Sequence, residues 1–156
     1  MAKKTNTKTT LTYNDARIMA SVLSASISPD AIEGMTHDKK SKALFRLGKT
    51  HGKLVSALKY YNKQVEAIQD KNILLDSDGE KVANIERVKN EETGEWEDKE
   101  NGFKIADQRA FARELTEISE EEVDVELSMI PLSWLDGNTN LGGIASACSM
   151  MVAEDE

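Results

Sequence analysis

The chain has 156 residues, of which 39% are hydrophobic, 31% charged and 5% aromatic, and its formal net charge at pH 7 is −8. This length fits one domain or two small ones, and the composition favours a helix-rich protein with a modest core. A single cysteine excludes an internal disulfide framework and a zinc site built from several cysteines. The first ten residues lack the apolar region of a signal peptide, and no apolar run approaches the roughly 20 residues of a spanning helix. We therefore expect a protein that is neither secreted nor held in a membrane.

The charges are distributed unevenly along the chain. Residues 1–72 hold 13 Lys and Arg against 6 Asp and Glu, a net of +7, whereas residues 73–156 hold 7 against 22, a net of −15. The basic half is therefore expected to attract the acidic half, within one molecule or between neighbouring molecules.

The N-terminal residues 1–10, rich in Thr and Lys, predict a disordered basic tail. Residues 11–156 are expected to form one α+β domain that is mostly helical. Thr12 or Asn14 is expected to cap the first helix, and Pro29 to end it, because a residue before proline avoids the helical conformation. One side of this helix carries the apolar residues Tyr13, Ala16, Met19, Ala20, Leu23 and Ile27.

A heptad pattern predicts that residues 36–72 form one long, coiled-coil-like helix, roughly 50 Å in length. Its a and d positions define an expected oligomer seam, which consists of Leu44, Leu47, His51, Leu54, Leu58, Tyr61, Val65 and Ile68 and continues to Asn72 and Leu75. The short helices predicted elsewhere cover only part of this seam, so we expect two seams to pair in a homo-oligomer. The polar residues His51 and Asn72 are expected to fix the register of that pairing.

The side of the long helix opposite the seam is basic. This basic stripe consists of Lys39, Lys42, Arg46, Lys49, Lys53, Lys59 and Lys63. It is either a solvated outer face or a contact for a polyanion, which could be nucleic acid or the acidic half of a neighbouring subunit. No aromatic residue interleaves the stripe, which argues against single-stranded nucleic acid.

Three acidic residues alternate around Gly79 as they do at the start of a calcium loop: Asp76, Asp78 and Glu80. In such a loop the sixth position is Gly and the twelfth is a bidentate Glu, but here they are Lys81 and Arg87. We therefore predict no metal site but a tight turn that follows the long helix, with Gly79 at positive φ.

The remaining pattern alternates strands and short helices. Residues 73–106 predict a β-hairpin region, with turn signals at Gly94 and at Asn101–Gly102. Asp107 is expected to cap a helix over 107–119. Residues 122–130 are expected to form a strand of a small antiparallel sheet, with Val123, Val125, Leu127 and Met129 on one face. Helical spacing predicts a last helix over 140–153 through Leu141, Ile144, Ala145, Cys148, Met151 and Val152.

No catalytic constellation is recognisable, so we expect neither an enzyme nor a cofactor. His37 and His51 have no clustered cysteine and make no zinc signature. Cys148 lies on an apolar face and is expected to be a buried structural thiol. The acidic segments EISEEEVDVE and EETGEWEDKE are typical of solvated faces, although paired carboxylates can also serve a hydrolase. The chain has no P-loop, dinucleotide fingerprint or nucleophile elbow.

Four segments within residues 36–153 carry a family resemblance: KLVSALKYYNKQVEAIQDKN, DSDGE, FARELTEISEEEVDVELSMIPLSWL and the last apolar helix. In this order they resemble small uncharacterised proteins of tailed bacteriophages, which have a helix–hairpin–helix core similar to prefoldin. The helix over 107–119 departs from a prefoldin hairpin, whose two arms match in length, and this argues against chaperone activity.

The resemblance implies a non-enzymatic accessory or structural protein of a phage virion or of its assembly, found in the host cytoplasm or the virion. Its expected partners are itself and another phage or host protein, with nucleic acid less favoured and no membrane. The first alternative is a phage-encoded inhibitor that binds a host protein, and the second is an accessory protein that binds a polyanion.

Overall fold

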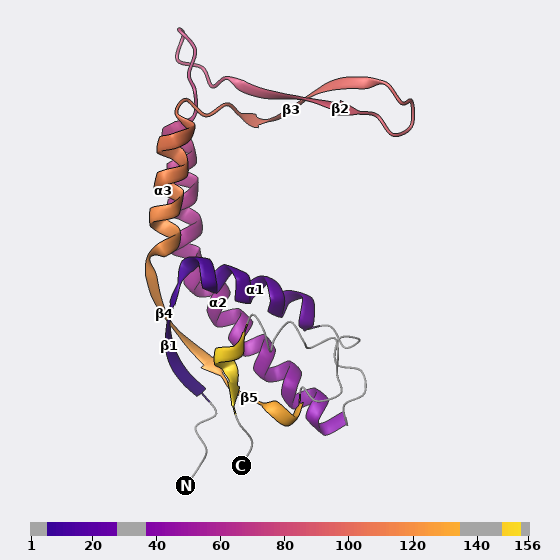
Figure 1. Cartoon of the computed structure of the whole chain (residues 1–156), viewed down its shortest axis with the longest axis vertical. Coiled ribbons are helices and arrows are strands. Elements are labelled where there is room, and N and C mark those ends of the chain that lie inside the picture. Colours follow the sequence, from indigo (N-terminus) through magenta and orange to yellow (C-terminus); the bar gives the residue numbers. More distant parts are fainter. Residues whose placement is uncertain (1–5, 28–36, 135–147, 154–156) are drawn as a thin grey trace. The chain divides into compact units, whose positions relative to one another are not determined.

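A computed structural model of the chain describes residues 6–27, 37–134 and 148–153, and of residues 37–40 only the backbone. Within these ranges the chain is α+β, with three helices, one of them long, and small antiparallel sheets, as the sequence predicted (Figure 1). It divides into two compact units, the first made of residues 1–62 and 119–156 and the second of residues 63–118. The sequence analysis predicted one domain over 11–156. The boundary between the two units falls within helix α2, and the apolar pattern along a single helix does not reveal such a boundary.

The first unit contains an antiparallel pair of strands, β1 (Asn6–Thr12) and β4 (Glu122–Ser128). The prediction of a disordered tail is therefore wrong for residues 6–10. Their alternating, β-branched threonines suit a strand, and β4 supplies the hydrogen-bonding edge that an isolated segment lacks. On the exposed face, Asp124 Oδ1 accepts a hydrogen bond from Thr10 Oγ1 at 2.7 Å and Asp124 Oδ2 lies 3.3 Å from Lys8 Nζ. These two contacts, the one from Thr10 first, lower the pKa of the Asp124 carboxyl.

Helix α1 (Tyr13–Ser26) begins at the N-cap Thr12, whose Oγ1 accepts a hydrogen bond from the backbone N–H of Asp15 at 3.1 Å. The structure thus selects Thr12 over Asn14 as the cap. The buried residues of the helix are Tyr13, Ala16, Met19, Ala20, Leu23 and Ser26, which confirms the predicted apolar side except at Ile27, a half-buried residue just beyond the helix.

Helix α2 (His37–Asn72) is the predicted long helix, and it contributes residues 37–62 to the first unit and 63–72 to the second. In the first unit its buried face consists of Ala43, Leu47, Thr50, Leu54, Leu58 and Tyr61. Leu44 and His51, which the heptad placed on the seam, are only half-buried. In the first two heptads the buried residue therefore precedes each predicted a position by one, while the d residues Leu47 and Leu54 are buried as predicted.

The described residues 148–153 do not form the α-helix that was predicted over residues 140–153. Strand β5 (Ile130–Pro131) pairs in parallel with β6 (Val152–Ala153). The 3-10 turn η2 (Leu132–Trp134) follows β5, and the 3-10 turn η4 (Ser149–Met151) precedes β6. Cys148 and Met151 are both buried, a spacing of three that fits a 3-10 turn as well as an α-helix. The prediction of a helix is thus wrong for residues 148–153. Its other apolar positions, Leu141, Ile144 and Ala145, lie outside the described residues.

The second unit combines the end of α2 with α3 (Gln108–Glu120), most of which lies in this unit, and a two-stranded ribbon. Asp107 caps α3 as predicted, because its Oδ1 accepts hydrogen bonds from the backbone N–H groups of Arg109 and Ala110, each at 3.0 Å. The ribbon pairs β2 (Ala83–Lys89) with β3 (Trp96–Phe103) in antiparallel fashion.

The Asn101–Gly102 sequence does not form the turn that was predicted there. It lies inside β3, where the register shifts between Ala83 and Ile85 of the partner strand and Gly102 has a φ of 66°. Such a shift is a β-bulge, which uses the same positive-φ glycine as a hairpin turn, so the dipeptide alone does not distinguish the two.

Candidate protein-interaction surfaces

The seam expected to pair two molecules is largely covered within one chain. In the first unit four of its members are buried: Leu47, Leu54, Leu58 and Tyr61. Thr50 Oγ1 accepts a hydrogen bond at 2.9 Å from the backbone N–H of Ser128, which holds α2 against β4. The expectation of an uncovered seam is therefore wrong in the first unit, because strand β4 and helix α1 cover what short helices alone would have left exposed.

Aromatic contacts hold α1 against the same face of α2. The ring of Tyr13 stacks on that of Tyr61 with centroids 5.4 Å apart, and Arg17 Nη1 donates a hydrogen bond to the Tyr61 hydroxyl at 3.0 Å. Burial, followed by the negative charge of Glu121 and the neighbouring Tyr60, raises the pKa of the Tyr13 hydroxyl. This cluster is a packing contact between α1 and α2.

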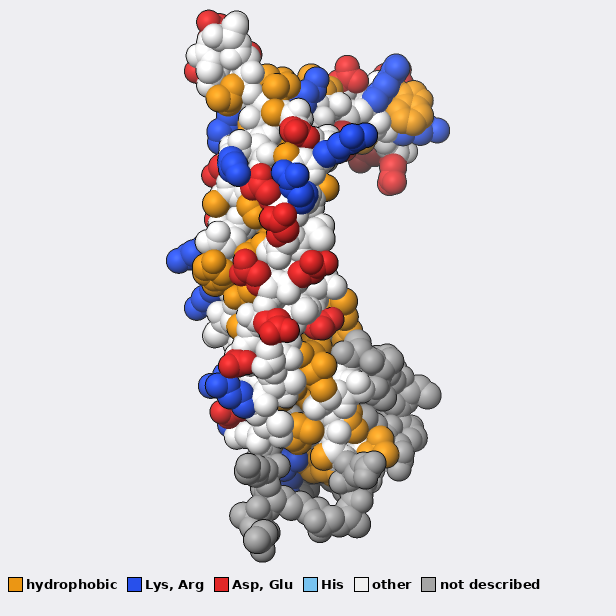
Figure 2. Space-filling view, turned by 60° about the vertical axis from the view of Figure 1, so that its left-hand side comes forward, with side chains coloured by type: hydrophobic (Ala, Val, Ile, Leu, Met, Phe, Trp, Pro, Cys, Tyr) orange, Lys and Arg blue, Asp and Glu red, His pale blue; other side chains and the backbone are white. Residues whose placement is uncertain are grey.

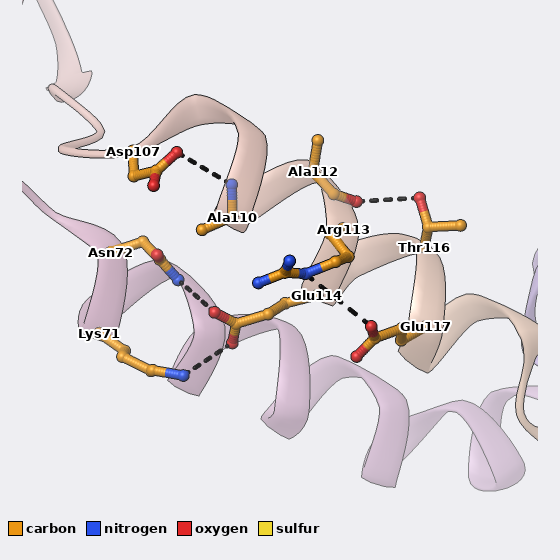
Figure 3. Close-up of polar contacts among 9 residues, drawn as sticks. All are labelled: Lys71, Asn72, Asp107, Ala110, Ala112, Arg113, Glu114, Thr116 and Glu117. Atoms are coloured by element: carbon orange, nitrogen blue, oxygen red, sulfur yellow. Dashed lines mark hydrogen bonds and ion pairs between the residues drawn. The ribbon is translucent and has the colours of Figure 1, made fainter.

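Asn72 was expected to set the register between two molecules, but it joins two helices of one molecule. Its Nδ2 donates to the Ile68 carbonyl at 2.8 Å. The same nitrogen lies 3.5 Å from Glu114 Oε1 on α3 (Figure 3). Lys71 Nζ donates to Glu114 Oε2 at 3.1 Å. The hydrogen bond from Lys71, with that from Asn72, lowers the pKa of the Glu114 carboxyl. Val65 and Ile68, the last seam positions before Asn72, are half-buried in this unit.

In the part of the chain that the structure describes, Arg46 of the basic stripe contacts a backbone carbonyl and an aromatic ring. Arg46 Nη1 donates to the Met129 carbonyl at 2.9 Å, and its guanidinium carbon lies 4.8 Å from the ring centroid of Trp134. Within the described part of the chain, Lys49 and Lys53 form no ion pair. The exposed residues of the stripe include Lys49, Lys53, Lys59 and Lys63. The side chain of Lys39 lies outside the described residues.

An open hollow lies along one part of this stripe, in the first unit. Its volume is about 440 Å³, and it is lined by Asn6, Ser41, Lys42, Phe45, Arg46, Lys49 and Ser128; we call it the basic hollow. Phe45 is 71% exposed, although it is a large hydrophobic residue. The statement that no aromatic residue interleaves the stripe is therefore wrong, because Phe45 lines the same hollow as three cationic residues.

The segment with calcium-loop spacing is a tight turn, as predicted. Asp76 Oδ1 accepts hydrogen bonds from the backbone N–H groups of Asp78 at 2.9 Å and Glu80 at 3.0 Å, and Gly79 has a φ of 81°. The Asp76 carboxylate thus organises the backbone of its own turn. In the ranges that the structure describes, no group of three or more His, Cys, Asp or Glu residues is placed to hold a metal ion.

One face of the ribbon exposes hydrophobic side chains that sequence reasoning did not single out. Ile85, Trp96 and Phe103 are 59%, 60% and 47% exposed. The register places them on one face, because Trp96 and Phe103, at the two ends of β3, lie opposite Lys89 and Ala83, which share a face of β2 with Ile85. Basic, acidic and hydrophobic side chains are mixed along the ribbon, the arm at upper right in Figure 2. The sequence signal for this face was that Ile85 and Trp96 each stand between polar or charged residues. The structure pairs them with Glu100 and Lys89, so neither has an apolar partner on the opposite strand.

The turn that joins β2 to β3 is acidic and well ordered by hydrogen bonds. Asn90 Oδ1 accepts from the backbone N–H of Glu92 at 2.9 Å, and the Asn90 carbonyl accepts from Gly94 at 2.8 Å. Glu91, Glu92 and Glu95 are exposed. We call residues 90–96 the acidic tip; in Figure 1 it lies at the end of the ribbon that is distant from α2 and α3 of the same unit.

Cys148 is fully buried, in agreement with the expectation of a structural thiol. Burial raises the pKa of this thiol to about 11, so that it remains protonated at neutral pH. A buried, protonated thiol is a poor nucleophile, and Cys148 therefore offers no chemistry to the surfaces described above.

None of the described helices is both long enough and apolar enough to cross a membrane. Comparisons of the chain with models of protein families, with curated proteins and with solved structures gave no match.

Proposed function

We propose that this chain is a non-enzymatic accessory or structural protein of a tailed bacteriophage, which acts by binding other protein surfaces, including a second copy of itself. The phage origin rests on the sequence resemblance alone. The observation that carries the binding role is the ribbon face along which Ile85, Trp96 and Phe103 are all exposed. Exposed aromatic and aliphatic side chains that share one face are typical of contact surfaces between proteins.

The ribbon also supports this role by its construction. A two-stranded ribbon is marginally stable by itself, and both of its edges carry backbone groups that can pair with another strand. Every residue of β3 is exposed, so the strand adds little to the core of its own unit. An element that contributes little to the core of its own unit is well suited to contact a partner.

Two alternatives are distinguished by what the partner is. An inhibitor would use the same ribbon face against a host protein and would be absent from the virion. A polyanion-binding protein is favoured by one specific observation, the exposed Phe45 beside Lys42, Arg46 and Lys49, since aromatic rings and cations together bind single-stranded nucleic acid. The net charge of −8 opposes this alternative, because it repels a polyanion at long range.

The test has two parts. Light scattering at micromolar concentration is expected to detect species larger than a monomer. The double variant Ile85→Thr, Trp96→Thr is expected to weaken this association. Lys99→Thr places the same residue on the opposite face of β3 and is the matched control, with no effect expected.

Quantitative mass spectrometry of purified virions then identifies the role. Presence at high copy supports a structural protein, and absence from virions together with tight binding to a host protein supports the inhibitor. A wild-type protein that stays monomeric and is found with neither partner contradicts the proposal.

A further inference from the structure

The basic hollow combines features that suit an acidic ligand with an aromatic side chain. Lys42 and Lys49 are exposed on its rim, and Phe45 is exposed between them along the helix. No acidic side chain is among its described lining residues. Arg46 is held in place by Met129 and Trp134, so one cation of the hollow is already oriented before a ligand arrives.

The acidic tip has the complementary features. It presents the carboxylates of Glu91, Glu92 and Glu95 next to the exposed ring of Trp96. Its backbone is fixed by hydrogen bonds that Asn90 accepts through its side chain and its carbonyl. Because the loop is already ordered, docking it costs less conformational entropy than docking a flexible acidic segment.

We propose that the acidic tip of one copy docks in the basic hollow of a second copy. Three carboxylates then meet three cations, and Trp96 lies near Phe45 and the guanidinium of Arg46. Such charges attract at long range and fix the orientation of the complex, while the aromatic contact is removed from water. This inference rests on the proposed function, of which it specifies one contact.

The two surfaces lie in different parts of the chain, so the contact is heterologous. Each copy would offer one tip and one hollow, and copies would add head to tail into a ring or an open chain. This arrangement predicts that a copy with only one working surface ends the chain.

The experiment uses two variants with side chains of nearly unchanged size. The hollow variant carries Lys42→Gln and Lys49→Gln, and the tip variant carries Glu91→Gln and Glu92→Gln. Circular dichroism confirms that each is folded. Sedimentation velocity is expected to show that each alone associates about tenfold more weakly than wild type, since two exposed ion pairs are lost. An equimolar mixture is expected to form a one-to-one complex and nothing larger, because one variant supplies the tip and the other the hollow.

A control variant carries Lys59→Gln and Lys63→Gln, which removes the same charge outside the hollow and is expected to associate as wild type does. The inference is overturned if both variants associate like wild type, and the broader proposal then stands through another surface. It is also overturned if the mixture behaves like the separate variants, or if wild type is monomeric at every concentration. Binding of a single-stranded oligonucleotide that is lost in the hollow variant and kept in the tip variant, without self-association, assigns the hollow to nucleic acid instead.

Discussion

A substitution at Leu54 distinguishes two interpretations of helix α2. The heptad pattern placed Leu54 on a seam between two molecules, whereas the structure buries it within one molecule. Its side chain is 0% exposed. Replacing it with Ala removes three carbon groups from the core, about 2.4 kcal/mol at roughly 0.8 kcal/mol each. The cavity that remains adds to this, and core Leu→Ala changes cost about 2–5 kcal/mol in total. We expect Leu54→Ala to lower the free energy of unfolding of the first unit by an amount in this range.

This loss is measured by urea unfolding, in which the fluorescence of Trp134 reports the unfolding. The Trp96→Phe background removes the other tryptophan, so that the signal comes from the first unit alone. Val55→Ala is the matched control, because Val55 is the next residue on the helix and is 44% exposed. It is expected to change stability by about 0.5 kcal/mol or less. A loss in Leu54→Ala that depends on the protein concentration would show that Leu54 contacts another molecule. A loss no larger than that of the control would show that Leu54 contacts no core.

Three further outcomes are expected. Thr50→Val leaves the buried N–H of Ser128 without its acceptor and costs about 1–3 kcal/mol in urea unfolding, whereas Thr50→Ser keeps the hydroxyl and most of the stability; equal losses would contradict this role. Because the pKa of Glu114 is lowered in the folded state, its contact with Lys71 stabilises the fold at pH values above the pKa of the unfolded state. This stabilisation is lost as the pH falls through the pKa of the folded state. Glu114→Gln is therefore expected to flatten the acid side of the stability profile measured by circular dichroism. Cys148 is expected to react with a thiol reagent only as fast as the protein opens, and rapid labelling of the native protein would be inconsistent with its burial.

The features that local sequence predicted well are those that local chemistry decides. Thr12 and Asp107 each supply an oxygen to backbone N–H groups within three residues, and Gly79 adopts the positive φ that its turn requires. The alternation in β4 was readable because Val125 and Leu127 face the core of their own unit. None of these depends on a distant segment.

The features that were missed depend on residues far apart in the chain. Strand β1 exists because β4, more than a hundred residues later, offers an edge to it, as in the pairing of Thr9 with Val125. The buried face of α2 includes Thr50 where the heptad favoured His51, since Ser128 supplies a hydrogen-bond donor at that point. The hydrophobic face of the ribbon depended on a register that a one-residue bulge changes.

Sedimentation velocity of the wild-type protein, over a micromolar concentration series in low and in high salt, tests the central claim of association through complementary charged surfaces most directly. The account predicts species larger than a monomer that grow with concentration in low salt and dissociate as salt screens the ion pairs. A single monomeric species throughout the series, or assemblies of one size that salt does not change, would contradict it.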